Sequence, residues 1–346
     1  MSSIWTALGQ RPSATRQADF AASPNYADGA FQSPLPIAQP NPISILPRWF
    51  SDRSPNREPS APIPTEARSA ADYTEPFEGV RATWLGHSTV LLELDGHRFL
   101  IDPVFGHASP TPLFGVPRFF PSPLALDDLP PLDAVLLSHD HYDHLEASTM
   151  QALAHRVTRF ITPLGMGDHL RYWGVPADRI TERDWWQTTT VGGIALTATP
   201  ARHFSGRNVV GRNSTQWAGW SLHGPQHRMY YSGDSGWMPQ QFGEIGERVG
   251  PFDLTLMQIG AYDELWADLH MFPEEAVRAH EAVRGDVLLP IHWGTFNLAF
   301  HGWTDPIDRL LAAAPSGMTV ATPRPGQFVT LGQPVPTESW WRGMDS

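Results

Sequence analysis

Apolar residues recur in short runs from residue 80 onward, with polar or turn-forming residues between the runs. The first of these cover 81–86, 88–94, 98–104 and 133–138, and runs of this length bounded by turn signals are typical of β-strands. The tripeptide Asp-Gly-His at 95–97 predicts a hairpin turn between two of them. The pattern therefore indicates several strands that follow one another closely.

Helical patterns alternate with further strand-like runs downstream. The sequence predicts helices over 145–155, around 166–173, over 273–284 and over 305–314, and a β-rich block over 189–232. The last two helices carry a proline near the first turn with acidic residues beside it, which is typical of a helix N-terminus. Consecutive strands flanked by helices favour an α/β fold, with two sheets between layers of helices.

Residues 1–76 differ from the rest of the chain and predict an irregular N-terminal arm, followed by one domain over 77–346. The arm is rich in proline and serine and shows no sustained period of 2 or 3.6. It is either a disordered tail or an extended segment that lies over the globular core. In the second case the anchoring side chains would be Ile43, Ile45, Leu46, Trp49 and Phe50.

Composition and charge narrow the class of protein. The 346 residues include 24 basic and 36 acidic side chains, a net charge of −12, and 41% are hydrophobic. The negative charge argues against nucleic acid as a partner, and the apolar content suits a globular protein with a large core. No apolar run approaches the roughly 18 residues of a membrane-spanning helix, and the first residues lack a secretory signal pattern. We therefore expect a cytoplasmic protein.

Candidate chemistry depends on histidine, since the chain has 15 histidines and no cysteine. Any metal ion must be held by imidazole and carboxylate groups, which suit zinc, iron or manganese. The segment LLSHDHYDHL places His139, His141, Asp143 and His144 directly after an apolar strand. Alternate residues at a strand end point the same way, so His139 and His141 can bind one cation while the other two reach a second.

Three further side chains that can bind a metal follow apolar runs. His203 comes after GIALTATP, Asp234 after RMYYSG, and His292 after DVLLPI. Open α/β sheets place their functional sites at the carboxyl ends of strands. The sequence therefore predicts that these three residues complete a site for two metal ions.

The order of these residues resembles the metallo-β-lactamase fold superfamily of metal-dependent hydrolases. The segments TWLGHSTVLLEL, FLIDPVF, YYSGDSGW, PEEAVRAH and PIHWGTFNLAFHGW resemble more specifically the branch that contains phospholipases D that hydrolyse N-acyl-phosphatidylethanolamine. This similarity runs from about residue 80 to residue 314. It implies a four-layer αββα sandwich with two zinc ions at the mouth of the sheets, iron or manganese being alternatives.

The resemblance also implies roles for single residues. The first zinc ion would be held by His139, His141 and His203. The second would be held by Asp143, His144 and His292, with Asp234 as the bridge between the two ions. Asp102, in FLIDPVF, matches a residue that orients a ligand imidazole. His270 matches a histidine that faces the substrate, and with Asp143 and Asp234 it completes the candidate catalytic residues.

Two candidate substrate contacts come from residue type. Trp266 belongs to a set of tryptophans near the motifs that can line a groove for an acyl chain. Arg207 lies near His203 and can extend a positive patch for an anionic substrate.

The implied reaction is hydrolysis of a phosphodiester in N-acyl-phosphatidylethanolamine or a related lipid. Two metal ions about 3.5–4 Å apart can hold a bridging hydroxide as the nucleophile and stabilise the charge of the transition state. The segment DELWADLH, which follows GAY and ends at His270, departs from the phospholipase pattern. It favours an alternative, a metal-dependent lactonase or amidase for a small soluble substrate. Peripheral contact with the inner face of a membrane and a homodimer are further expectations.

Overall fold

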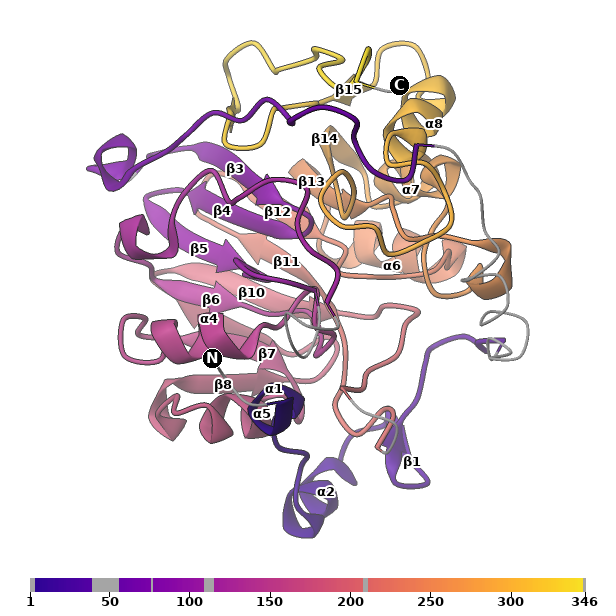
Figure 1. Cartoon of the computed structure of the whole chain (residues 1–346). Coiled ribbons are helices and arrows are strands. Elements are labelled where there is room, and N and C mark those ends of the chain that lie inside the picture. The colour runs from indigo at the N-terminus through magenta and orange to yellow at the C-terminus, as the bar shows by residue number, and fades with distance from the viewer. Residues whose placement is uncertain (1–3, 39–55, 76, 109–114, 208–210, 345–346) are drawn as a thin grey trace.

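Two β-sheets form the centre of the molecule (Figure 1) in the computed structural model, which describes residues 4–38, 56–75, 77–108, 115–207 and 211–344. The first sheet has the strand order β16-β3-β4-β5-β6-β7-β8 and the second has the order β15-β14-β13-β12-β11-β10-β9. The strands of the first sheet are β3 (Val80–Gly86), β4 (Thr89–Leu94), β5 (His97–Ile101), β6 (Ala134–Leu136), β7 (Phe160–Pro163), β8 (Ile180–Arg183) and β16 (Phe328–Thr330). Those of the second are β9 (Thr188–Val191), β10 (Ile194–Thr199), β11 (Gly219–His223), β12 (Arg228–Tyr231), β13 (Phe252–Gln258), β14 (Gly285–Ile291) and β15 (Thr319–Val320).

Both sheets are mixed, with antiparallel hairpins at one side and parallel strands at the other. Strands β3, β4 and β5 are antiparallel, whereas β5 to β8 run parallel. In the second sheet β9 to β12 are antiparallel and β12 to β15 parallel. The predicted hairpin is confirmed: Leu94 pairs with His97, and Asp95 and Gly96 both have positive φ, as a two-residue hairpin turn requires.

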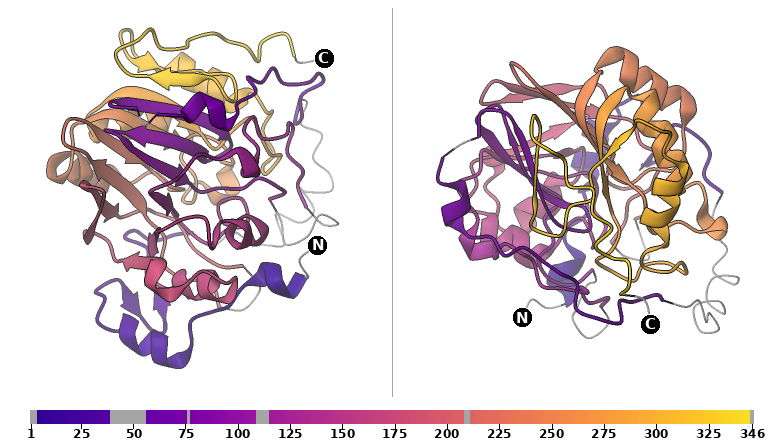
Figure 2. Two further views of the ribbon diagram at one scale, coloured as in Figure 1. Left: turned by 90° about the vertical axis from the view of Figure 1, so that its left-hand side faces the viewer. Right: turned by 90° about the horizontal axis from the view of Figure 1, so that it is seen from above.

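Helices cover the outer faces of the sheets, which gives the four layers visible in the right-hand view of Figure 2. The α-helices of these layers are α4 (Ala147–Leu153), α5 (Gly167–Tyr172), α6 (Pro239–Arg248), α7 (Pro273–Ala282) and α8 (Asp305–Ala313). Short 3₁₀ turns are η1 (Ala70–Tyr73), η2 (Leu126–Asp128), η3 (Ala177–Arg179) and η4 (Glu264–Trp266). The predicted αββα sandwich is therefore confirmed.

Strand β4 shows why the layers hold together, because all of its side chains are buried. Leu92 belongs to the large core between the sheets, which also contains Trp220 of the second sheet. Leu91 points the other way and joins a second core with Met150 of α4 and Leu170 of α5. A strand buried on both faces needs apolar residues at successive positions, as this one has.

Helix α6 was not predicted from the sequence. Its two glycines, Gly243 and Gly246, disfavour a helix, yet Phe242 and Ile245 are fully buried in the core. Tertiary packing of that apolar face thus outweighs the weak local propensity.

The N-terminal arm contains regular elements that its composition does not reveal. It forms helices α1 (Ile4–Leu8) and α2 (Ala14–Phe20) and the hairpin β1 (Tyr26–Ala27) and β2 (Ala30–Phe31). Ser13 caps α2, and the ring of Phe20 packs on those of Tyr26 and Phe31. Elements this short cannot show a periodic pattern. The expected anchors between Ile43 and Phe50 lie outside the described residues.

Among the helices that the structure describes, none is long and apolar enough to cross a membrane.

Candidate metal centre

The predicted ligands meet at one edge of the sandwich because each follows the carboxyl end of a strand. His139 to His144 follow β6, His203 follows β10, Asp234 follows β12 and His292 follows β14. His292 has a φ of 65° and Asp102, directly after β5, has a φ of 37°. Left-handed backbone is uncommon for residues other than glycine, so the chain turns sharply at both positions.

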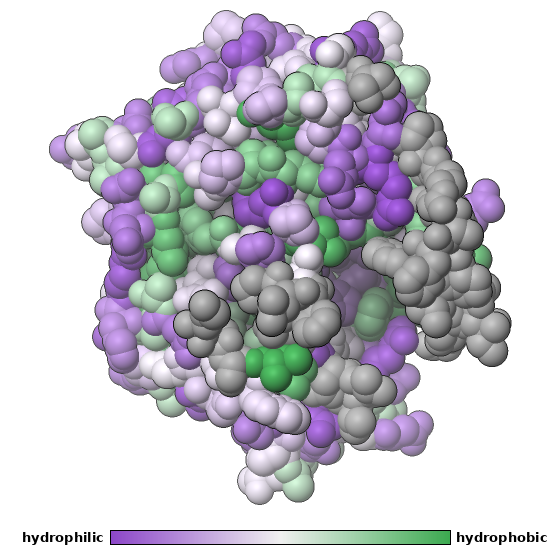
Figure 3. Space-filling view, in the orientation of Figure 1, coloured by the Kyte–Doolittle hydropathy of each residue, from purple (hydrophilic) through white to green (hydrophobic). Residues whose placement is uncertain are grey.

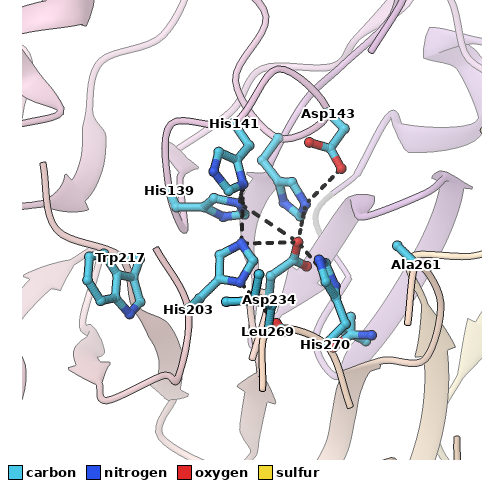
Figure 4. Close-up of polar contacts among 12 residues, drawn as sticks. His139, His141, Asp143, His203, Trp217, Asp234, Ala261, Leu269 and His270 are labelled. Carbon is cyan, nitrogen blue, oxygen red and sulfur yellow. Dashed lines mark hydrogen bonds and ion pairs between the residues drawn. The ribbon is translucent and has the colours of Figure 1, made fainter. Parts of the chain in front are cut away.

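Three imidazoles form the first cluster (Figure 4). Nε2 of His139 lies 2.9 Å from Nδ1 of His141, and Nε2 of His203 lies 3.2 Å from the same atom. On its other side, Nδ1 of His203 lies 3.0 Å from the carbonyl oxygen of Leu269, so Nδ1 carries the proton and Nε2 keeps its lone pair. The three nitrogens are thereby directed at a common point.

A second cluster surrounds the carboxylate of Asp234. Its Oδ2 atom lies 3.1 Å from Nε2 of His144 and 3.0 Å from Nε2 of His292. Oδ2 of Asp143 lies 3.5 Å and 3.3 Å from the same two nitrogens. The Oδ2 atom of Asp234 also lies 3.8 Å from Nε2 of His139, so this oxygen stands between the two clusters.

Several of these buried nitrogen and oxygen atoms lack a hydrogen-bond partner among the described residues, which is expected of atoms that bind a metal ion. Nε2 of His144, Nε2 of His292 and Oδ1 of Asp234 are buried and make no hydrogen bond within the described structure. Buried polar atoms are normally hydrogen-bonded, so a cluster of unsatisfied imidazole and carboxylate atoms indicates a site that can take a metal ion. The ligand atoms of His139, His141 and His203 lie within 4.8 Å of one another, as do those of a second group that includes Asp143, His144 and His292. Imidazole and carboxylate donors suit zinc, iron and manganese alike.

The carboxylates of this centre are held in their ionised form. Burial raises the pKa of Asp234, but the neighbouring His144 and His292 more than offset it, so that the pKa lies well below its usual range. Burial, followed by the charge of His144, holds the pKa of His139 well below its usual value. Burial lowers the pKa of His144, but the negative charges of Asp234 and Asp143 raise it by more. The pKa of His144 therefore lies well above its usual value.

Asp102 binds the imidazole of His144, a predicted ligand, through the Nδ1 atom, which faces away from Asp234. Its fully buried carboxylate accepts hydrogen bonds from Nδ1 of His144 at 2.6 Å and from the backbone N–H of Ser138 at 2.7 Å. The hydroxyl groups of Ser138 and Tyr231 donate to the same carboxylate. The structure thus places Asp102 where it orients His144.

A pocket of about 280 Å³ opens onto the clusters. His270 and Trp266 line it, together with Asp143, Asp234 and apolar side chains that include Phe204 and Leu298. Nδ1 of His270 is 3.9 Å from Oδ2 of Asp234. Burial lowers the pKa of His270 to about 3, so its imidazole is neutral at physiological pH.

Arg207 occupies a different place from these pocket residues. Its buried guanidinium donates hydrogen bonds to the carbonyl oxygens of Asp140 and Leu145, at 2.6 and 2.8 Å, and to that of Ala7 at 2.7 and 3.0 Å. The described structure therefore commits this cation to backbone carbonyls within and directly after the segment 139–144, and Arg207 is not among the residues that line the pocket.

His87 belongs to the site although sequence reasoning did not single it out. Its Nε2 atom lies 2.9 Å from Oδ2 of Asp143, and its side chain is 3% exposed. The signal was present, because His87 follows the apolar strand β3 just as His203 and His292 follow theirs. His87 was not predicted because it lies far along the sequence from the cluster at residues 139–144.

Comparison with known families decides the classification. Residues 97–293 match the family described as the beta-lactamase superfamily domain. The chain belongs to the metallo-β-lactamase superfamily and is a metal-dependent hydrolase.

Other members of the metallo-β-lactamase superfamily are similar over most of the chain. An uncharacterized protein of Mycobacterium tuberculosis is 47% identical over 330 residues, which are 92% of this chain and 88% of the relative. The N-acyl-phosphatidylethanolamine-hydrolyzing phospholipase D 1 of Caenorhabditis elegans is 38% identical over 253 residues, 69% of this chain and 71% of the relative. The metallo hydrolase Igni18 of Ignicoccus hospitalis has the same fold, with a TM-score of 0.55 and 22% identity over 74% of this chain and 99% of that one.

Proposed function

We propose that this protein is a dinuclear, zinc-dependent phosphodiesterase of the phospholipase D type that hydrolyses N-acyl-phosphatidylethanolamine or a related lipid. The observation that carries the proposal is the position of Asp234 Oδ2 between two clusters of imidazoles, of which the second has unsatisfied Nε2 atoms, in the lining of a partly apolar pocket. The similarity to the nematode phospholipase supports the substrate class.

In this proposal His139, His141 and His203 would hold one metal ion, Asp143, His144 and His292 would hold the other, and Asp234 would be available to both. Two bound divalent ions supply Lewis acidity for the oxygens of a phosphodiester and lower the pKa of water. The carboxylate of Asp234 is ionised because its pKa is low, so it could donate to an ion on either side.

The remaining residues of the pocket position the substrate. The neutral imidazole of His270 faces the same space as Asp234 and can hydrogen-bond a phosphate oxygen. The side chains of Trp266, Phe204, Leu269 and Leu298 form the apolar wall, which excludes water and provides a surface for an acyl chain.

One experiment on the purified protein tests metal content and substrate together. We expect about two zinc ions per chain by elemental analysis and release of N-acylethanolamine from N-acyl-phosphatidylethanolamine in detergent micelles. Hydrolysis of bis(p-nitrophenyl) phosphate should accompany it. A protein that binds two metal ions but turns over lactones or amides instead would replace the lipid substrate with a small soluble one.

Contact with the cytoplasmic face of a membrane is a further part of the proposal. In the described structure Ile4, Trp5 and Tyr172 are the exposed large hydrophobic residues, and Trp5 is 72% exposed. Elsewhere the face seen in Figure 3 mixes hydrophobic with hydrophilic residues. Tryptophan and tyrosine favour the membrane interface, so Trp5→Ala should reduce co-sedimentation with phospholipid vesicles.

A homodimer is proposed as well, and light scattering would test it.

A further inference from the structure

We propose that His87 is a positioning residue that holds the second ligand cluster in place, through its side chain on Asp143 and its backbone on His292. This inference rests on the proposed two-metal site. It concerns a residue outside the seven expected ligands.

The side chain of His87 fixes the carboxylate of Asp143. Its Nε2 atom lies 2.9 Å from Oδ2 of Asp143, the same oxygen that lies 3.3 Å from Nε2 of His292 and 3.5 Å from Nε2 of His144. Asp143 needs such a partner because its side chain is 16% exposed toward the pocket. A hydrogen bond from an N–H group at Nε2 would keep this oxygen directed between the two imidazoles.

The backbone of His87 fixes His292. The carbonyl oxygen of His87 accepts the backbone N–H of His292 at 2.9 Å, and the two rings lie with their centroids 3.9 Å apart. One residue therefore contacts two members of the second cluster, one from strand end β6 and one from strand end β14.

His87 is itself held on several sides. Its backbone N–H donates to the hydroxyl of Thr295 at 2.6 Å, and its carbonyl also accepts the indole N–H of Trp84 at 2.8 Å. Its φ of 54° is left-handed, a conformation that histidine and asparagine adopt more readily than most residues. A residue whose backbone is held in this way can present its side chain to a neighbour in a fixed position.

The effect of His87 falls on one cluster. Within the described structure its side chain makes no hydrogen bond to His139, His141 or His203. Loss of its N–H group should therefore weaken one metal position and leave the other unchanged.

Two amide variants form a matched pair for the test. In His87→Gln the side-chain amide reaches about as far as Nε2 of histidine, whereas in His87→Asn it is one methylene shorter, although asparagine tolerates the left-handed backbone well. Zinc affinity of each protein would be measured by competition with a chromophoric chelator, and cobalt(II) spectra would report the geometry at each position. His280→Asn is the control, since His280 is buried on Thr255 outside the clusters.

We expect two equivalents for the wild-type protein, and for His87→Asn a second equivalent that binds about 10–100-fold more weakly while the first is unchanged. His87→Gln should recover most of the loss, and His280→Asn should bind as the wild type does. Wild-type affinity in His87→Asn, or an equal loss at both positions, would overturn the proposal. Failure of His87→Gln to recover binding would overturn the hydrogen-bonding role in favour of direct ligation by the imidazole. Neither the zinc affinity nor the cobalt(II) spectrum depends on a substrate. If the wild-type protein fails to hydrolyse the phospholipid, that result would count against the proposed function and not against the role of His87.

Discussion

Nδ1 of His144 lies 2.6 Å from Oδ2 of Asp102, and neither side chain has any exposed surface. The contact holds a proton on Nδ1 of His144 and directs Nε2 toward Asp234, so that Nε2 is the atom that would bind a metal ion once deprotonated. The tautomer and the direction of a ligand are thus set by a carboxylate that does not itself reach the pocket.

Replacement of Asp102 by asparagine should therefore act through His144. An amide binds the Nδ1 proton less strongly and places an N–H₂ group among hydrogen-bond donors, so we expect a loss of about 10–100-fold in metal affinity or in turnover. Zinc titration of the apoprotein measures it. Asp133→Asn is a suitable control, because Asp133 accepts the N–H of Arg98 at 2.8 Å outside the clusters. Unchanged affinity in Asp102→Asn would show that His144 does not depend on this contact.

Asp234→Ala should empty both metal positions. The carboxylate that stands between the clusters is removed, so both positions lose an anionic oxygen donor. We expect less than one zinc ion per chain by elemental analysis after dialysis, with turnover lost in parallel. Asp253→Ala, which removes a carboxylate bound to the backbone of Arg228, should retain the metal content. Two retained ions in Asp234→Ala would contradict a shared ligand.

His270→Ala should separate metal binding from catalysis. His270 lines the pocket and is not one of the seven proposed ligands, so we expect full metal content and a fall of about 10²-fold in kcat, the typical loss when one hydrogen bond to a transition state is removed. Elemental analysis and steady-state kinetics on the same preparation measure both. If a metal equivalent disappears with the imidazole, His270 is a ligand.

Metal binding should release protons, and it should weaken as the pH falls. In the metal-free protein, burial lowers the pKa of His144 and of His292, but the negative charge of Asp234 and the other carboxylate contacts raise it by more. Each pKa therefore lies above the usual histidine value. A metal ion binds only the deprotonated imidazole, so lowering the pH through the raised pKa values adds protons that compete with the metal. Calorimetry in buffers of different ionisation enthalpy counts the protons released. A proton count of zero at neutral pH would contradict the raised pKa values.

The part of the site that the sequence predicts well is the part encoded locally. His139, His141, Asp143 and His144 lie within six residues after one strand, and strand geometry alone directs them to one edge. The positions of His203, Asp234 and His292 were predictable for the same reason, as each follows an apolar run.

The contacts that could not be predicted join distant segments. Arg207 was expected to face an anionic substrate, yet its partners include the carbonyl of Ala7, which is 200 residues away. The hydrogen bond between His87 and Asp143 spans 56 residues. Neither residue type nor spacing reveals such pairs, because they depend on how the sheets and the arm pack.

The hydrogen bonds of Arg207 have a consequence for the order of folding. They fasten the segment from Asp140 to Leu145, which carries three of the proposed ligands, to an N-terminal helix, and the imidazole of His169 accepts the N–H of Gln10 nearby. Contacts between residues so far apart in sequence form late, because a long loop must close first. We therefore expect the ligand segment to become fully protected from amide hydrogen exchange only after the N-terminus has docked. The metal centre would then mature at the end of folding rather than nucleate it.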